Sequence, residues 1–320
     1  MTEVSQVQLV DRLRHHIPKK GDLVKILTEL LSISPDSVYR LLRGESEFTL
    51  SEVVKIAHRF DLSMDNLYNE RINSTTFHYN KLYNRDNAFE PYFVNLTQQM
   101  ERLRRAEGKL YFVCSELPIS QSFQNQELRE FKLFYWQRVI LNRQIMRGIK
   151  YDKTFAIGFN LNQYVDSLMD SYRHIDKTEI WTEETLDDTI RQLKYCRDCG
   201  LMDHENLLNV CQSLIHTLNR LENELESQTY SDDPHRLRFY VSSVELGNNV
   251  IHMNYGQYRT SYIKFNTFNT VATRSDDFCD EIEHMIEGVL AKSVEISGRS
   301  DVLRHRFFTT LRSKVEALMR

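Results

Sequence analysis

The apolar positions between residues 22 and 44 predict two short helices joined by a tight turn. The first helix carries its apolar side chains on one face, at Leu23, Ile26, Leu27, Leu30 and Leu31. The pattern breaks at Ser32-Ile33, and the second helix then buries Val38, Leu41 and Leu42. Two helices joined in this way form a helix-turn-helix, a motif whose second helix enters the major groove of DNA.

The residues at both ends of the second helix agree with this prediction. Ser34 stands at the N-cap position, and Pro35 follows at the first helical position, where its missing N–H is harmless. Asp36 lies beside the positive end of the helix dipole. Gly44 then predicts the end of the helix.

The flanking residues extend the pattern into a bundle of four or five helices. An earlier helix is predicted from Leu9, Val10, Leu13 and Ile17. A later one begins after Thr49 and carries Leu50, Val53, Val54, Ile56, Ala57 and Phe60. A last short helix is expected to start at Ser63.

The segments LTELLSIS, SVYRLLRG and TLSEVVKIAHRFDLSMDNLY resemble the Cro/repressor-type helix-turn-helix regulators, and more narrowly those of Bacteroidetes bacteria with a large C-terminal domain. The resemblance covers roughly residues 6–70. It extends weakly through ELPISQSFQNQELREFKLFYW and FYVSSVELGNNVIHMNY. The resemblance implies a transcriptional regulator but does not imply its effector. A helical bundle that docks a protein partner and does not bind DNA remains the alternative.

The geometry of a recognition helix assigns the expected DNA contacts. Its N-terminal residues and the position one turn later face the base edges, here Pro35, Asp36 and Arg40. Neighbouring residues are placed for phosphates or flanking bases: Ser34, Ser37, Tyr39 and Arg43. An arginine such as Arg40 can form a bidentate contact to guanine, and Asp36 can accept a hydrogen bond from cytosine.

The charge distribution departs from that of a strongly basic DNA-binding domain. Residues 1–70 contain nine Lys or Arg and eleven Asp or Glu, whereas residues 71–150 contain thirteen against seven. Phosphate neutralisation supplies much of the affinity for DNA, so a local basic face is required. Arg40 and Arg43 are expected to form it with Arg12, Arg14, Lys19 and Lys20. The acidic residues expected to face away are Glu45, Glu47, Glu52, Asp61 and Asp65. The modest affinity of one such domain favours a homodimer.

The remaining chain is predicted to be a linker at 71–87 and an α-rich domain at 88–320. Helical periodicity appears near 88–107, 126–146, 160–173, 183–198, 204–227, 276–294 and 300–319. A short buried strand is expected at 109–116. A β-hairpin is expected near 236–273, where a GNN turn separates RLRFYVSSVEL from VIHMNY. The predicted fold is therefore mainly α, with a small antiparallel sheet in the larger domain.

The sequence offers little support for catalysis. It contains no Walker A loop, GxGxxG, HExxH or GxSxG, so we expect no catalytic or cofactor-binding residues. The best metal candidate is the group Cys196, Cys199, His204 and Cys211, but its spacing matches no known ligand pattern. We therefore predict no metal site. An aromatic cluster at Phe131, Phe134, Tyr135 and Trp136 is expected in the core, with a ligand pocket as the alternative.

The whole pattern predicts a sequence-specific regulator that binds double-stranded DNA as a homodimer. The large domain is expected to dimerise, to sense a small-molecule or protein effector, or both. No stretch approaches the roughly 18 apolar residues of a membrane helix, so we expect no membrane association and a cytoplasmic location. The five cysteines fit reduced thiols better than a disulfide framework.

Overall fold

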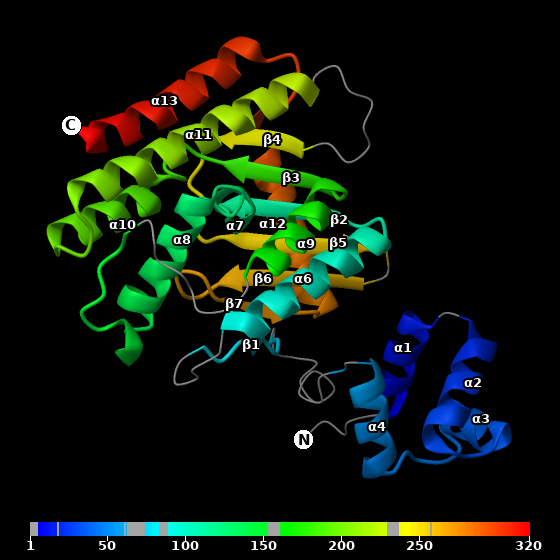
Figure 1. The fold of residues 1–320 in the computed structure, drawn as a ribbon. Coiled ribbons are helices and arrows are strands. Elements are labelled where there is room, and N and C mark those ends of the chain that lie inside the picture. Colours follow the sequence, from blue (N-terminus) through cyan, green and yellow to red (C-terminus); the bar gives the residue numbers. More distant parts are fainter. Residues whose placement is uncertain are drawn as a thin grey trace. The chain divides into compact units, whose positions relative to one another are not determined.

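The computed structural model describes residues 6–17, 19–60, 62, 74–82, 89–152, 161–228, 237–256 and 258–320. The chain divides into two compact units, Met1–Phe77 and His78–Arg320 (Figure 1). Each unit has its own apolar core. None of the described helices is long and apolar enough to cross a membrane.

Four described helices make up the first unit: α1 (Gln6–His16), α2 (Lys20–Leu31), α3 (Pro35–Arg43) and α4 (Leu50–Phe60). Their apolar faces meet in one core around Leu13, Leu27, Val38 and Ile56, which are all fully buried. The predicted helix-turn-helix is therefore formed by α2 and α3. The short helix expected from Ser63 lies outside the described residues.

The second unit is built around an eight-stranded sheet with the order β1-β7-β6-β5-β2-β3-β4-β8. The strands are β1 (His78–Tyr79), β2 (Lys109–Cys114), β3 (Asp176–Trp181), β4 (Leu237–Ser242), β5 (Val250–Tyr255), β6 (Tyr258–Lys264), β7 (Thr270–Thr273) and β8 (Ser293–Glu295). β3 is parallel to both β2 and β4, and the other pairs are antiparallel.

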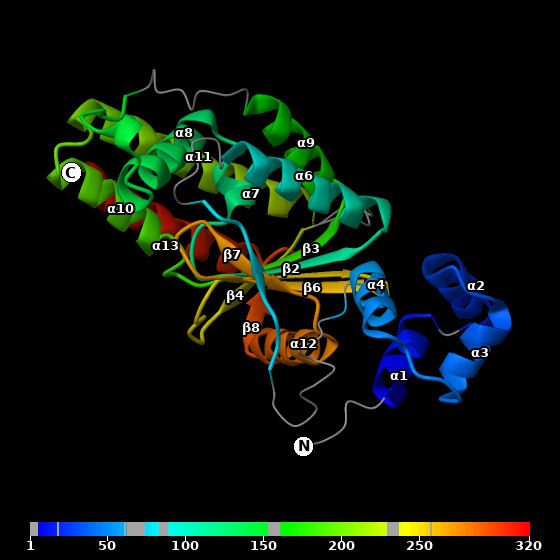
Figure 2. The ribbon, with the colours of Figure 1, turned by 90° about the horizontal axis from the view of Figure 1, so that it is seen from below.

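Helices cover both faces of this sheet (Figure 2). One face carries α6 (Phe89–Arg105), α7 (Ile119–Ser122), α8 (Gln126–Tyr135), α9 (Asn162–Arg173), α10 (Asp187–Asp198), α11 (His204–Gln228) and α13 (Asp301–Met319). The opposite face packs on α12 (Asp276–Leu290) through Val113, Ile180 and Ile282. The prediction of a mainly α protein with a sheet in the larger domain is confirmed.

The hairpin predicted across the GNN turn is wrong, although both of its strands exist. β4 pairs with β3 and β8, whereas β5 pairs with β2 and β6. The hairpin in this region is instead β5–β6, where Tyr255 pairs with Tyr258 and Gly256 has a positive φ of 75°. The GNN turn predicted the start of β5 at Val250 correctly, but β4 already ends at Ser242, and neighbouring strands pair with each of them.

Two further segments differ from the expectation. The helix predicted over 126–146 ends at Tyr135 and continues as a π-helical turn, η1 (Trp136–Ile140), and a 3₁₀ turn, η2 (Gln144–Met146). Within the predicted linker 71–87, β1 pairs with β7 and Leu82 is buried in the core of the second unit. The segment from His78 to Leu82 therefore belongs to the sheet domain.

Candidate nucleic-acid interface

The recognition helix α3 is closed at both ends by its own residues. The Ser37 N–H donates to Ser34 Oγ at 3.1 Å, so Ser34 is the N-cap, and Pro35 opens the helix. At the other end, Gly44 has a positive φ of 75°, and its N–H donates to the carbonyls of α3. Ser32 ends α2 in the left-handed conformation, with a φ of 56°. Ser32 and Ser34 together fix the turn between α2 and α3, and Gly44 fixes the end of α3.

One side of α3 is buried and the other is exposed. Val38, Leu41 and Leu42 pack into the core of the first unit. The predicted contact residues lie on the open side: Ser34, Pro35, Asp36, Ser37, Arg40 and Arg43 are exposed, and Tyr39 is half-buried. The structure therefore brings all seven predicted contact residues together on one short helix and its cap.

The two arginines of this surface differ in their partners. Among the residues that the structure describes, the Arg40 guanidinium has no hydrogen bond or ion pair. Arg43 pairs with Glu45 through two contacts, Nε to Oε1 at 2.7 Å and Nη2 to Oε2 at 2.9 Å. This hydrogen bond holds the pKa of the Glu45 carboxyl below its usual value. Arg40 is thus available to a ligand, whereas Arg43 must first leave Glu45.

Residues of α1 hold the C-terminal end of α3 in place. Gln6 Nε2 donates to the carbonyl oxygens of Leu41 and Ser46 at 2.7 and 2.6 Å, and Gln6 Oε1 accepts from the Phe48 N–H at 3.0 Å. Arg14 Nη2 reaches the Leu42 carbonyl at 3.3 Å. The sequence pattern did not identify Gln6 as a support, because its partners lie some 40 residues away in the chain.

Several basic and acidic residues around α3 already form contacts within the first unit. Lys20 lies over the Tyr39 ring, 5.5 Å from its centroid. Glu52 accepts the Thr49 N–H at 2.7 Å and forms the capping box of α4. Glu45 is paired with Arg43, so it lies next to the recognition helix, although the sequence analysis expected it to face away. Asp61 and Asp65 fall outside the described residues.

The other sequence candidates lie in the second unit. Cys196 and Cys211 are fully buried in its core, whereas Cys199 and His204 are exposed. Within the described part of the chain, no group of three or more His, Cys, Asp or Glu side chains is arranged to hold a metal ion. Phe131 and Phe134 are core residues. Trp136 lines a cavity.

Comparison with known proteins agrees with the geometry of the first unit. Residues 3–82 match the family model of the BetR domain. BetR domains form a helix-turn-helix-like family of DNA-binding domains. The match covers 3–82 of 320 residues and therefore concerns the first unit and the short segment that reaches the sheet. No curated protein and no solved structure matches the chain. The chain thus carries a domain of DNA-binding, regulatory type at its N-terminus.

Proposed function

We propose that this protein is a sequence-specific transcriptional regulator of the Cro/repressor-like type that binds double-stranded DNA as a homodimer. The observation that carries the proposal is the exposed side of α3. There, Arg40 is exposed on a doubly capped helix, and its guanidinium forms no hydrogen bond or ion pair with a described residue. The BetR match over the same residues supports this role. A regulator of this kind acts on DNA, which agrees with the cytoplasmic location expected from the sequence.

The proposal of a homodimer rests on the low DNA affinity that we expect of one helix-turn-helix. A single helix-turn-helix contacts only a few base pairs, and residues 1–70 carry a net charge of −2. Their phosphate contacts therefore supply limited affinity. Joining two such units makes the second contact intramolecular and raises the overall affinity without new contacts. We assign dimerisation to the larger unit, since its sheet and helical layer far exceed what DNA docking requires.

Substitution of Arg40 tests the proposal directly. Randomised duplexes selected with the full-length protein should yield a defined motif. Arg40→Ala should reduce discrimination at one base position by about 1–3 kcal/mol, the usual value of a bidentate contact. Arg40→Lys is the matched control, because it keeps the charge but loses the planar fork. We expect Arg40→Lys to bind DNA with a salt dependence similar to that of the wild type. Its base preference should be relaxed to the same extent as that of Arg40→Ala.

The alternative, a bundle that docks a protein and does not bind DNA, predicts a different result. The wild-type protein would then enrich no motif, and all three forms would bind DNA equally weakly. An unchanged motif in Arg40→Ala would remove Arg40 from base recognition but leave DNA binding itself in place.

A further inference from the structure

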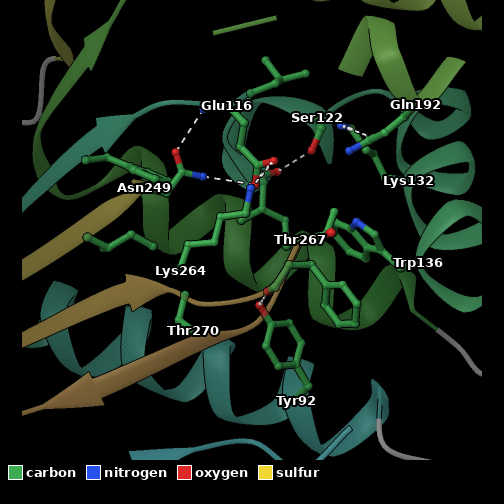
Figure 3. A pocket seen from close by; sticks show the side chains of 15 residues that line it. Tyr92, Glu116, Ser122, Lys132, Trp136, Gln192, Asn249, Lys264, Thr267 and Thr270 are labelled. Carbon is green, nitrogen blue, oxygen red and sulfur yellow. Dashed lines mark hydrogen bonds and ion pairs between the residues drawn. The ribbon is translucent and has the colours of Figure 1, made fainter. Parts of the chain in front are cut away.

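A cavity of about 60 Å³ lies at the carboxyl end of β2 in the second unit (Figure 3). One water molecule needs about 10–15 Å³ on this measure. The cavity therefore has room for about four to six non-hydrogen atoms. Its walls come from α6, α7, α8 and α10, from β2, β5 and the residues beside them, and from the β6–β7 connection.

The cavity lies where the parallel and antiparallel parts of the sheet meet. β2 lies between its parallel neighbour β3 and its antiparallel neighbour β5, which the chain reaches only after crossing back from β4. In α/β sheets, ligands bind beyond the carboxyl ends of strands where the strand order reverses. Glu116 follows β2 and Asn249 precedes β5, and both line the cavity.

Lys132 supplies a buried positive charge to this cavity. Its side chain is 3% exposed, and its Nζ donates to Thr189 Oγ1 at 2.7 Å and to Gln192 Oε1 at 2.9 Å. Both acceptors are neutral. An ammonium group has three N–H donors, and within the described residues the third one has no partner.

The carboxylate that lines the same cavity is already paired. Glu116 Oε2 lies 2.7 Å from Lys264 Nζ, and Glu116 Oε1 accepts from Asn249 Nδ2 at 3.1 Å. Asp188, the other carboxylate near Lys132, lies 3.9 Å from Lys264 and forms a 2.9 Å ion pair with Arg191. The charged side chains that line the cavity are thus two lysines and one glutamate. Burial, the largest effect, lowers the pKa of Lys132 to about 8. A bound anion would offset this cost of burial.

Another part of the lining is aromatic. Trp136 stacks on Phe268 with 4.5 Å between ring centroids, and Tyr92 OH donates to the Phe268 carbonyl at 3.0 Å. Trp136 also begins the π-helical turn, in which the Leu141 N–H donates to the Trp136 carbonyl at 2.8 Å. Such turns often occur at functional sites. Here the turn brings an indole ring to the cavity.

We propose that this cavity binds a small carboxylate of two to four carbon atoms. Its carboxylate would accept a hydrogen bond from Lys132, and its carbon chain would lie against Trp136 and Phe268. The chemical class follows from a buried ammonium group with one N–H donor left without an acceptor among the described residues, an apolar wall and a small volume. A role for this ligand as an effector rests on the proposed DNA-binding function, whereas the binding itself does not.

Calorimetry of the full-length protein tests the binding. Acetate, propanoate and butanoate are the probes, and propanamide is the uncharged control. We expect saturable binding of the carboxylates only. At pH 8, comparison of buffers with different ionisation enthalpies should show uptake of about half a proton, because a bound carboxylate raises the pKa of a half-protonated Lys132. At pH 6.5 the uptake should disappear, since Lys132 is then already charged.

Two variants locate the site. Lys132→Met should weaken propanoate binding at least tenfold. Gln192→Glu should also weaken propanoate binding at least tenfold, although it keeps Lys132. Its carboxylate would lie against Lys132 at the position of the present 2.9 Å contact and would compete with the ligand. Lys177→Met, which removes another lysine that is 3% exposed, is the matched control and should bind normally.

Wild-type protein that shows no saturable carboxylate binding would overturn the inference. So would equal binding of propanamide, or normal binding by either Gln192→Glu or a folded Lys132→Met. Carboxylate binding by a protein that enriches no DNA motif would support the site and would count only against the proposed DNA function.

Discussion

The ion pair between Arg43 and Glu45 lies beside the exposed side of α3, where we expect it to weaken DNA binding. Arg43 was predicted to contact a phosphate or a flanking base, and in the structure it forms two contacts with Glu45. Both side chains are about half-exposed, so the pair contributes little to stability. Its effect should instead appear in DNA binding, where Glu45 both occupies Arg43 and repels the phosphates.

Replacing Glu45 by Gln should therefore strengthen DNA binding. Release of Arg43 adds about one phosphate contact, so the slope of log K against log salt should become steeper by about one. Fluorescence anisotropy over a salt series measures this slope. Glu47→Gln is the control, since it makes the same charge change at an exposed side chain. If both variants change the slope equally, net charge and not release of Arg43 is the cause.

The N-cap of α3 determines how firmly the recognition helix is held. Ser34→Ala removes the acceptor of the Ser37 N–H, at a cost of about 1 kcal/mol. Amide exchange in α3 should then become about fivefold faster. Ser37→Ala is the control, because it keeps the capped N–H and removes only the 2.9 Å contact between the two hydroxyls. Equal exchange rates in the two variants would show that the cap does not stabilise α3.

A buried polar network joins α12 to the sheet. His252 Nδ1 lies 2.9 Å from Ser261 Oγ, and His252 Nε2 lies 2.9 Å from Glu283 Oε1. These three residue types also occur in hydrolase triads, but Ser261 and His252 are both fully buried. A substrate would not reach them, so we assign the network to packing. Arg259 lies beside it and pairs with Asp276 and Glu283.

This network makes stability depend on pH. Burial lowers the pKa of His252, and the hydrogen bond to Glu283 only partly opposes the effect. Below pH of about 6.5 the unfolded chain therefore binds more protons than the folded protein, and the free energy of unfolding falls by up to about 1.4 kcal/mol per pH unit. Above that pH this contribution is constant.

Urea unfolding between pH 7.5 and 5.5 measures this dependence. His252→Gln, in β5, should reduce the slope, whereas His284→Gln, at an exposed position of α12, should keep it. A slope that is unchanged in His252→Gln would assign the acid sensitivity to other groups.

Helices were predictable in this chain, and the central strand β3 was not. Its sequence, DKTEIW, is polar, yet Lys177, Thr178 and Glu179 are all buried. Glu179 accepts hydrogen bonds from Gln121 at 3.1 Å, from Trp181 at 2.9 Å and from Tyr172. Two of these donors come from α7 and α9, so the fold and not the local pattern makes the strand stable. Periodicity cannot show partners that lie far apart in the chain.

The two candidate sites also differ in whether they could be predicted from the sequence. The exposed side of α3 could be predicted because a capped helix places Ser34 to Arg43 by local geometry alone. The cavity could not, since Glu116, Lys132, Asn249 and Lys264 come from separate elements and meet only in the folded sheet. Of the predicted aromatic cluster, Trp136 is the member that lines this cavity.

At the scale of the whole molecule, the protein joins a small DNA-binding unit to a much larger unit that contains a cavity. A ligand can alter DNA binding through such a layout only if it binds two arrangements of the protein with different affinities. Dimerisation by the larger unit would supply these arrangements, because it fixes the distance between two recognition helices.

A hydroxyl-radical footprint of the full-length protein on its selected duplex tests the central claim most directly. If the protein binds as a homodimer, we expect it to protect two equivalent segments of a two-fold symmetric duplex from cleavage. Their centres should lie about 34–36 Å apart along the duplex, or a multiple of that distance. One protected segment, or uniform protection that does not depend on sequence, would contradict the proposal of a dimeric, sequence-specific regulator.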